Sequence, residues 1–132
     1  PTECYREEGF SYHYAPPSDY MPIKNHESVA SFLRSLNVPV SIGKGWTTDA
    51  IYNETVAKWK ERKGDGVLCV DMESSGLQAI ANHIGVEYYV FFFAGDILGE
   101  NWMAGDLGGE REKARQVGAA EAALAFGKSL LG

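Results

Sequence analysis

The chain has 132 residues, and its 12 Lys and Arg against 18 Asp and Glu give a formal net charge of −6. This length is typical of one domain, and a hydrophobic fraction of 45% is that of a globular protein with a core. The acidic balance argues against nucleic-acid polymers and anionic membranes as partners. The longest strongly apolar stretch, residues 88–95, is far shorter than the ~20 residues of a membrane helix. We therefore expect residues 1–132 to form a single domain.

The start of the chain and its potential metal ligands add further expectations. No basic stretch followed by an apolar segment opens the sequence, so we expect no signal peptide. Cys4 and Cys69 lie far apart, and neither they nor the histidines show metal-ligand spacing, so no metal site or disulfide is expected. A cytoplasmic location follows as the expectation. Because the chain opens at Pro1 without Met, we interpret it as beginning inside a longer polypeptide, with a mature N-terminus as the alternative.

The first part of the chain contains three predicted elements. The aromatic residues of Phe10–Tyr14 alternate along the chain, as in a half-exposed strand. Apolar residues spaced by three and four then predict a helix over Glu27–Leu36. The apolar run that follows predicts a buried strand over Val38–Gly43, before a polar connection.

The second part of the chain continues this alternation of helices and strands. Its predicted elements are a helix beginning near Asp49 or Asn53, a strand over Val67–Asp71, a helix ending at Ile84, a strand over Val86–Ala94, a loop over residues 99–109 and a helix over Glu110–Leu131. The run VLCVD is typical of a strand buried on both faces, and Gly85 suits a left-handed helix cap. Val86–Ala94 is the strongest strand signal because it is dense in aromatic and β-branched residues. The alternation predicts an α/β fold, in which ligands bind beyond the carboxyl ends of the strands.

Two of these strand ends carry carboxylates. Asp71 and Glu73 follow one strand, and one of them is a candidate acceptor for sugar hydroxyls; alternatively, Asp71 or the next serines cap the following helix. Asp96 follows a run of aromatic residues, and burial there disfavours the charged carboxylate, which suits a general acid. The alternative for Asp96 is a turn residue after Gly95.

A third candidate segment is Gly45–Thr55. Ile51 and Tyr52 are candidate walls for a planar ligand, with Asp49 and the neighbouring hydroxyls ordering the loop. The alternative is that Thr48 or Asp49 simply caps the next helix. These residues alone leave both interpretations open.

Three segments together carry a resemblance to a known family. They are, in chain order, Thr48–Tyr52, Val70–Ser74 and Gly95–Asp96. In this order and spacing they resemble the nucleoside phosphorylase family, that is, the purine nucleoside and uridine phosphorylase superfamily with its related nucleosidases. The upstream segment Gly9–Pro16 looks like the preceding strand of the uridine-phosphorylase-like branch. The resemblance implies a partial three-layer α/β/α fold with a mostly parallel or mixed sheet, and it places this chain in the C-terminal half of such a domain.

The resemblance also implies roles for individual residues. Glu73 would accept hydrogen bonds from the ribose 2′- and 3′-hydroxyls, beside Asp71, and Met72 would pack against the sugar. Asp96 would protonate the departing base. A carboxylate at the sugar and an acid at the base both help most in the transition state, where the sugar becomes oxocarbenium-like.

The base-binding residues implied by the resemblance are Thr48, Ile51 and Tyr52. Ile51 departs from the stacking Phe that the family usually has, although it keeps an apolar wall. The Gln and Arg with which the uridine branch grips a pyrimidine are missing after Tyr52, so Asp96 favours a purine or a broad specificity.

The resemblance implies no cofactor, with inorganic phosphate as the co-substrate. The family's Gly-rich, Arg-bearing phosphate site lies in the N-terminal half and has no counterpart here, so we expect this chain to be inactive or nearly so by itself. The expected products in the complete enzyme are a free base and pentose 1-phosphate. A nucleosidase that uses water, and a non-catalytic module for nucleoside binding or oligomerisation, are the alternatives. An open sheet edge favours a homo-oligomer or pairing with a complementary N-terminal half.

Overall fold

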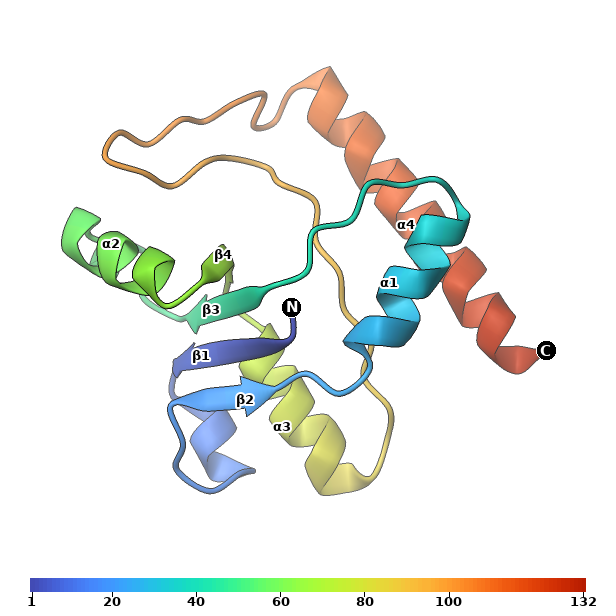
Figure 1. Ribbon diagram of the computed structural model, residues 1–132, viewed down its shortest axis with the longest axis horizontal. Coiled ribbons are helices and arrows are strands. Elements are labelled where there is room, and N and C mark those ends of the chain that lie inside the picture. Colours follow the sequence, from blue (N-terminus) through green and yellow to red (C-terminus); the bar gives the residue numbers. More distant parts are fainter.

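The computed structural model describes residues 1–132 and is built on one mixed sheet of four strands (Figure 1). The strands are β1 (Glu3–Glu7), β2 (Tyr20–Pro22), β3 (Lys44–Thr48) and β4 (Val67–Asp71). Their order across the sheet is β2-β1-β3-β4. β1 pairs with β2 antiparallel, whereas β1, β3 and β4 run parallel to one another. The predicted α/β class and mixed sheet are therefore confirmed.

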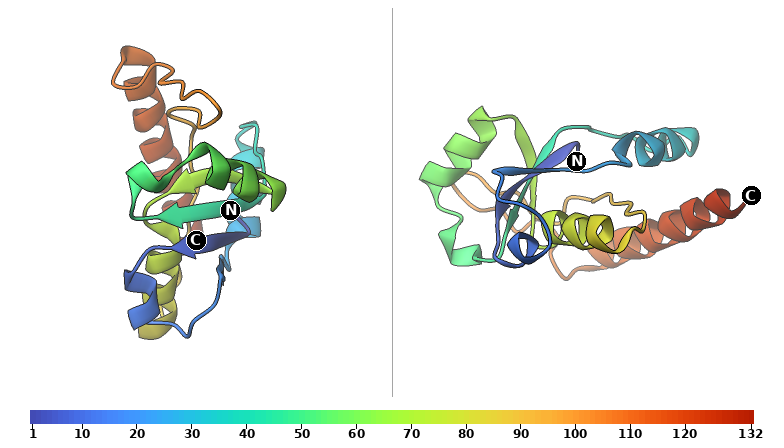
Figure 2. Two further views of the ribbon diagram at one scale, coloured as in Figure 1. Left: turned by 90° about the vertical axis from the view of Figure 1, so that its left-hand side faces the viewer. Right: turned by 90° about the horizontal axis from the view of Figure 1, so that it is seen from below.

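Helices occupy most of the remaining chain. They are the 3-10 turns η1 (Phe10–His13) and η2 (Ile51–Asn53) and the helices α1 (His26–Ser35), α2 (Val56–Gly64), α3 (Ser74–Ile84) and α4 (Glu110–Leu131). α3 packs along β1 and β2, α2 contacts β4, and α1 contacts α4. Seen from below, α1, α3 and α4 extend to one end of the sheet and α2 lies at the other (Figure 2). None of these helices has the length and apolar character needed to cross a bilayer.

The helix ends follow local chemistry. α3 ends at Gly85 in the left-handed conformation (φ 75°), as predicted, because glycine adopts this conformation without a Cβ clash. α2 begins later than predicted: its cap is Thr55, whose Oγ1 accepts a hydrogen bond from the Lys58 amide at 3.4 Å. The interpretation of Thr48 or Asp49 as this helix cap is therefore wrong.

The predicted strand at Phe10–Tyr14 is wrong, since Phe10–His13 form the turn η1. Two tertiary contacts explain the turn. The Glu8 carboxylate accepts a hydrogen bond from the Ser11 amide at 2.9 Å. The Phe10 ring lies against α3 at Gly76, where a Cβ atom would come within 1.7 Å of it. The alternating aromatic residues thus form a turn. The buried Glu8 carboxylate binds its backbone, and Gly76 leaves space for the Phe10 ring.

The strand predicted at Val38–Gly43 is also wrong, because β3 covers the polar segment Lys44–Thr48 that follows it. β3 lies between β1 and β4, with Gly45 opposite Cys4. Thr47 and Thr48 are fully buried here, and their hydroxyls find partners inside the protein. Polar residues can form a central strand when their hydrogen bonds are satisfied.

Val86–Ala94 forms no strand, in contrast to its strong signal in the sequence. The segment is extended and follows α3 toward α4, and no backbone amide from residue 87 to residue 96 donates to another backbone group. β4 is likewise less buried than predicted, since Leu68, its second residue, is 63% exposed. A strand needs a neighbouring strand for its ladder of hydrogen bonds, and residues 86–94 have no such neighbour here.

Two small groups of apolar side chains are buried. One surrounds the sheet and includes Cys4, Met21 and Trp46, and burial raises the pKa of the Cys4 thiol to about 12. The other joins Val29 and Leu33 of α1 to Phe126 of α4. The sheet group fixes the strand ends that carry the candidate site.

Candidate functional site

The carboxyl ends of β1, β3 and β4 meet at one edge of the sheet because the three strands are parallel. Asp71, at the end of β4, uses both carboxylate oxygens within the protein. Its Oδ1 accepts a hydrogen bond from Thr47 Oγ1 at 2.8 Å. Its Oδ2 accepts hydrogen bonds from the amides of Ser74 (2.7 Å) and Glu73 (3.3 Å). The alternative that Asp71 caps α3 is thus confirmed, and its contact with a sugar stays a prediction.

Met72 and Glu73 lie in the turn that Asp71 organises. Both residues are exposed, Met72 to 45%. Glu73 precedes the first residue of α3, and its side chain does not cap the helix. Its Oε2 accepts one hydrogen bond, from the Met72 amide at 3.2 Å, which leaves the other oxygen free. The turn therefore presents a carboxylate and an apolar side chain together, as the ribose prediction requires.

A buried polar network supports this edge from behind. Glu8 accepts hydrogen bonds from the Ser75 hydroxyl at 2.7 Å and from the Ser11 amide. The Ser11 hydroxyl in turn accepts from Arg6 Nε at 2.9 Å. The sequence analysis missed this network, although Cys4 and Arg6 of β1 and Glu8 directly after it occupy every second position and are all buried. Strand residues alternate between two faces, so every second residue lies on the same face. Applying this alternation to charged as well as apolar residues could have revealed the network.

The segment after β3 is ordered by hydrogen bonds and leaves its apolar residues in solvent. Thr48 Oγ1 accepts from the Ala50 amide at 3.3 Å, and Asp49 Oδ2 accepts from the Gly9 amide at 3.0 Å. Ile51 is 62% exposed and Tyr52 is fully exposed. The prediction that Asp49 and the hydroxyls order this loop is confirmed. The role of Ile51 and Tyr52 as walls for a base stays a prediction.

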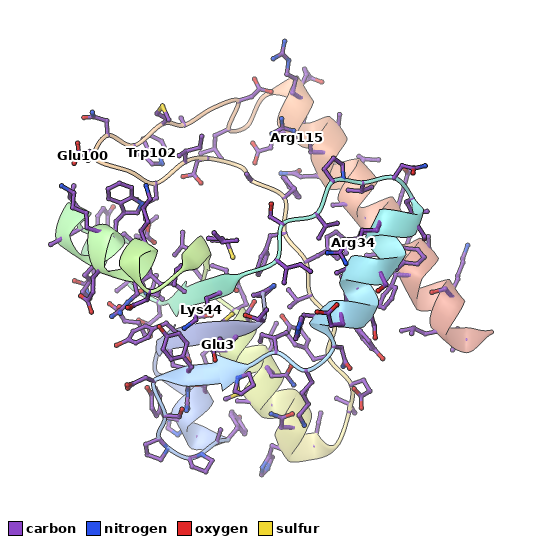
Figure 3. The ribbon with its side chains drawn as sticks, viewed as in Figure 1. Glu3, Arg34, Lys44, Glu100, Trp102 and Arg115 are labelled. Atoms are coloured by element: carbon purple, nitrogen blue, oxygen red, sulfur yellow. The ribbon has the colours of Figure 1, made fainter.

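Asp96 is exposed, so the expectation that the preceding aromatic residues bury it is wrong. Those residues lie in the extended segment and do not close around it. Its carboxylate accepts a hydrogen bond from Trp102 Nε1 at 2.6 Å. The loop is held over α2 by an ion pair of 2.7 Å between Glu100 and Lys60 (Figure 3).

Asp96 has an acidic neighbour that the sequence analysis did not single out. Burial raises the pKa of Glu54 above its ordinary value, and the charges of Asp96 and Glu7 raise it further. Glu7 ends β1, where its carboxylate is held by Lys58 and Asn53. The charges that act on the Glu54 carboxyl thus belong to the end of β1 and to the loop that carries Asp96.

We expect Glu54→Gln to increase the free energy of unfolding at pH 7. A raised pKa means that the folded chain binds the proton more tightly than the unfolded chain, so the associated stability is present below pH 4.5 and is lost as the pH rises through the raised value. The advantage of glutamine should accordingly shrink as the pH falls to 4.5. Urea denaturation of both proteins at the two pH values measures it, and an equal advantage at both would contradict the prediction.

Two acidic groups therefore lie in different loops: the turn with Asp71 and Glu73, and Glu54 with Asp96. Burial and, to a lesser extent, the charges of Asp71 and Glu73 raise the pKa of Tyr88 to about 12. No set of three or more His, Cys, Asp or Glu side chains is placed to hold a metal ion. The carboxylates of the two groups can accept hydrogen bonds and transfer protons.

Comparison with known proteins supplies the family. The model of the phosphorylase superfamily matches residues 1–131. Similar relatives include the DeoD-type purine nucleoside phosphorylases of Alkaliphilus metalliredigens (strain QYMF) and Thermoanaerobacter sp. (strain X514), each 31% identical over 85 residues. That of Buchnera aphidicola subsp. Acyrthosiphon pisum (strain Tuc7) is 30% identical over 74 residues, which are 56% of this chain and 30% of the relative. No solved structure matches the chain.

The matched residues make up a larger share of this chain than of each relative. The 85 matched residues make up 64% of this chain and 35% of the first two relatives, so the matched region spans about a third of their length. The family match, in contrast, leaves out a single residue of the 132. With the α/β sheet described above, this match shows that the chain belongs to the phosphorylase superfamily.

Proposed function

We propose that this chain forms the sugar- and base-binding part of a nucleoside phosphorylase, which converts a nucleoside and phosphate into a free base and pentose 1-phosphate. The relatives named as purine nucleoside phosphorylases favour a purine nucleoside as the substrate. The observation that carries the proposal is the turn after β4. There the structure leaves Glu73 exposed with a free carboxylate oxygen, beside an exposed Met72.

Each part of this turn has a distinct task in the proposed reaction. The carboxylate of Glu73 accepts hydrogen bonds from the two ribose hydroxyls and opposes the positive charge that develops on the sugar ring. Met72 supplies an adaptable apolar contact with the sugar. Asp71 acts by holding the turn, since its own oxygens are already bonded to Thr47 and to the start of α3.

We assign protonation of the base to the second acidic group, which consists of Glu54 and Asp96. Asp96 is the group at the position that the family resemblance assigns to the acid. The neighbouring Glu54 holds a proton to higher pH than an isolated glutamate, because it is partly buried and close to other carboxylates. In the proposed reaction, this pair supplies the proton to the departing purine.

Phosphate requires charge-assisted donors, and neither of the two buried arginines offers one at the protein surface. The guanidinium group of Arg6 is bonded to Ser11 Oγ and to the Pro16 carbonyl, at 2.9 and 2.7 Å. Arg62 is buried and paired with two carboxylates of its own helix region. Since both groups are buried, away from the exposed turn of Glu73, we infer that the phosphate donors come from a further part of the phosphorylase domain.

The test separates binding from turnover. Titration calorimetry of the 132-residue chain with inosine, adenosine and uridine should give heat of binding, strongest for a purine nucleoside. Chromatography of the same mixtures should show no released base, with or without phosphate. Absence of binding to all three would refute the proposal. Phosphate-dependent release would refute the missing phosphate site, and release without phosphate would assign a nucleosidase.

A further inference from the structure

The Asp96 carboxylate is bound by an aromatic side chain of its own loop. Trp102 Nε1 donates a hydrogen bond to Asp96 Oδ2 at 2.6 Å, and no protein group donates to the other oxygen, Oδ1. Trp102 is 59% exposed, so much of its indole ring lies in solvent beside the carboxylate. A ligand that reaches Asp96 Oδ1 from solvent therefore comes close to the indole.

Backbone contacts fix the position of Trp102 relative to Asp96. Ile97 and Met103 form an antiparallel bridge, in which each amide donates to the carbonyl of the other residue, at 3.0 and 3.1 Å. The bridge closes a short hairpin over residues 97–103, and Asp96 and Trp102 lie at its base. Because the hairpin is closed by its own backbone, the indole is held beside the carboxylate before any ligand binds.

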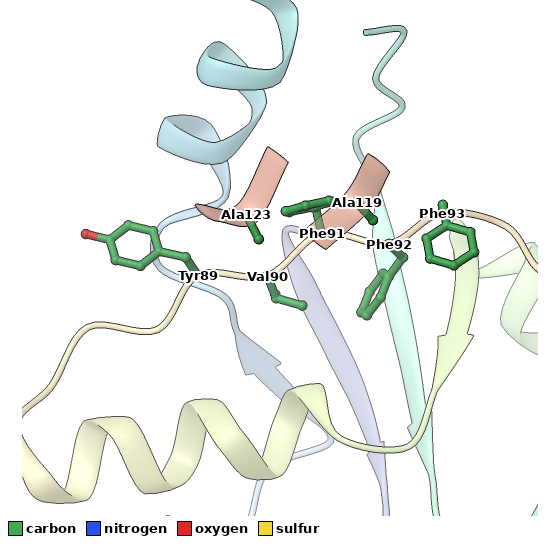
Figure 4. A pocket seen from close by; sticks show the side chains of 7 residues that line it. All are labelled: Tyr89, Val90, Phe91, Phe92, Phe93, Ala119 and Ala123. Carbon is green, nitrogen blue, oxygen red and sulfur yellow. The ribbon is translucent and has the colours of Figure 1, made fainter. Parts of the chain in front are cut away.

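The hairpin is anchored to the rest of the protein at its tip and at its start. At the tip, Glu100 forms the ion pair of 2.7 Å with Lys60 of α2 (Figure 3). At the start, the aromatic residues 89–93 line an apolar cavity of about 340 Å³ together with Ala119 and Ala123 of α4 (Figure 4). Contacts with both α2 and α4 thus hold the loop that carries Trp102.

The anchoring on α2 places the hairpin near the segment after β3. A Cβ atom at Gly99 would lie 4.0 Å from Trp59 Cζ2, so the hairpin tip lies against the first part of α2. The Trp59 amide donates to the carbonyl of Thr55, the cap of this helix, which directly follows the turn that contains Ile51. Ile51 is aliphatic and offers no aromatic face. Trp102 is the exposed aromatic residue that the structure places at Asp96.

A purine base fits a surface that combines an indole with a free carboxylate oxygen. The base is planar and stacks on aromatic side chains, because it presents a π face. Its edge carries nitrogen atoms that form hydrogen bonds with a carboxyl group. Two planar groups bonded to the two oxygens of one carboxyl group can lie face to face. Stacking on Trp102 and a hydrogen bond to Asp96 are therefore available to the same ligand.

We propose that Trp102 is the stacking surface for the base, which lies against the exposed indole while one of its nitrogen atoms bonds to Asp96 Oδ1. The role of Trp102 rests on the function proposed above and extends it, because it adds a contact that discriminates among bases. A purine has two fused rings and a pyrimidine has one, so stacking on the bicyclic indole favours the purine. The hydrogen bond to Asp96 lowers the entropy cost of stacking, since the indole is already fixed.

Titration calorimetry with variants of the hairpin tests the stacking contact. Trp102→Ala should weaken binding of inosine by about 5- to 100-fold, the range for loss of one contact between a base and an aromatic ring, and should weaken binding of uridine less. Trp102→Phe keeps an aromatic ring but cannot donate to Asp96, so it should lose less affinity than Trp102→Ala. Met103→Ala removes another exposed apolar side chain of the hairpin and should leave the affinity unchanged.

Tryptophan fluorescence supplies a measurement on the unaltered chain. Of its three tryptophans, Trp46 is buried, Trp59 is half-buried and Trp102 is exposed. A purine stacked on Trp102 should quench the emission as inosine or hypoxanthine is added. Trp59→Phe should retain this quenching, and Trp102→Phe should abolish it. Hypoxanthine has no sugar, so Glu73→Gln should leave its quenching unchanged.

The outcomes distinguish the role of Trp102 from the proposed function. Inosine that binds in the calorimeter without quenching Trp102 would overturn the stacking contact alone. Equal losses of affinity in Trp102→Ala and Trp102→Phe would overturn it too, because the hydrogen bond to Asp96 would then account for the effect. An equal loss in Met103→Ala would do the same, by assigning the effect to the hairpin as a whole. Quenching by hypoxanthine without binding of any nucleoside would support Trp102 and refute the sugar site, and absence of both would refute both.

Discussion

Glu73→Gln is expected to weaken binding of inosine to this chain by about 10- to 100-fold. The substitution keeps the size of the side chain and removes the charge that strengthens its hydrogen bonds to two sugar hydroxyls, bonds worth about 1.5–3 kcal/mol when one group is ionised. Folding should be unaffected, because Glu73 is exposed and does not cap α3. Titration calorimetry measures the affinity, and urea denaturation checks the fold.

A matched control and a second ligand make the Glu73 result specific. Glu121→Gln removes an exposed carboxylate from α4 and should leave the affinity unchanged. With 2′,3′-dideoxyinosine, which lacks both hydroxyls, wild type and Glu73→Gln should bind equally weakly, because the interaction is already absent. Equal losses from Glu73→Gln with both ligands would place the sugar elsewhere.

Asp71→Ala is expected to destabilise the chain by about 2–4 kcal/mol. The change removes the acceptor of two amides at the start of α3, which costs about 1 kcal/mol as a lost cap. It also deprives the buried hydroxyl of Thr47 of its acceptor, at a further cost of about 1–3 kcal/mol. Asp71→Asn keeps one carbonyl oxygen and should recover part of the loss. Urea denaturation provides the measurement.

Asp106→Ala is the control for Asp71. The Asp106 carboxylate accepts hydrogen bonds from the Arg111 and Glu112 amides in the first turn of α4, and it is exposed. Its loss should therefore cost only the cap, about 1 kcal/mol. If both substitutions cost the same, the buried contact of Asp71 with Thr47 contributes nothing. Nucleoside affinity should fall in Asp71→Ala and not in Asp106→Ala, since only the former holds the turn of Glu73.

The sequence determined the elements whose signals are local. The spacing of apolar residues located the helices near residues 26–35 and 110–131, and Gly85 marked the end of α3. VLCVD was correctly predicted as the strand β4. The two carboxylates after it, Asp71 and Glu73, were correctly placed at a strand-to-helix junction. These features depend on neighbours within one or two turns of the chain.

Other features depend on residues far away in sequence, so only the tertiary structure decided them. β3 falls on the polar segment Lys44–Thr48 because partners on β1 and β4 satisfy its hydrogen bonds. The difference between Asp71, both of whose carboxylate oxygens are bonded internally, and Glu73, which keeps one oxygen free, depends on the position of Thr47 on the adjacent strand. Asp96 is exposed because the aromatic run before it has no sheet neighbour. The strand propensity of a residue reflects how well its side chain packs against neighbouring strands. Without such neighbours, even Val86–Ala94 does not form a strand in this chain.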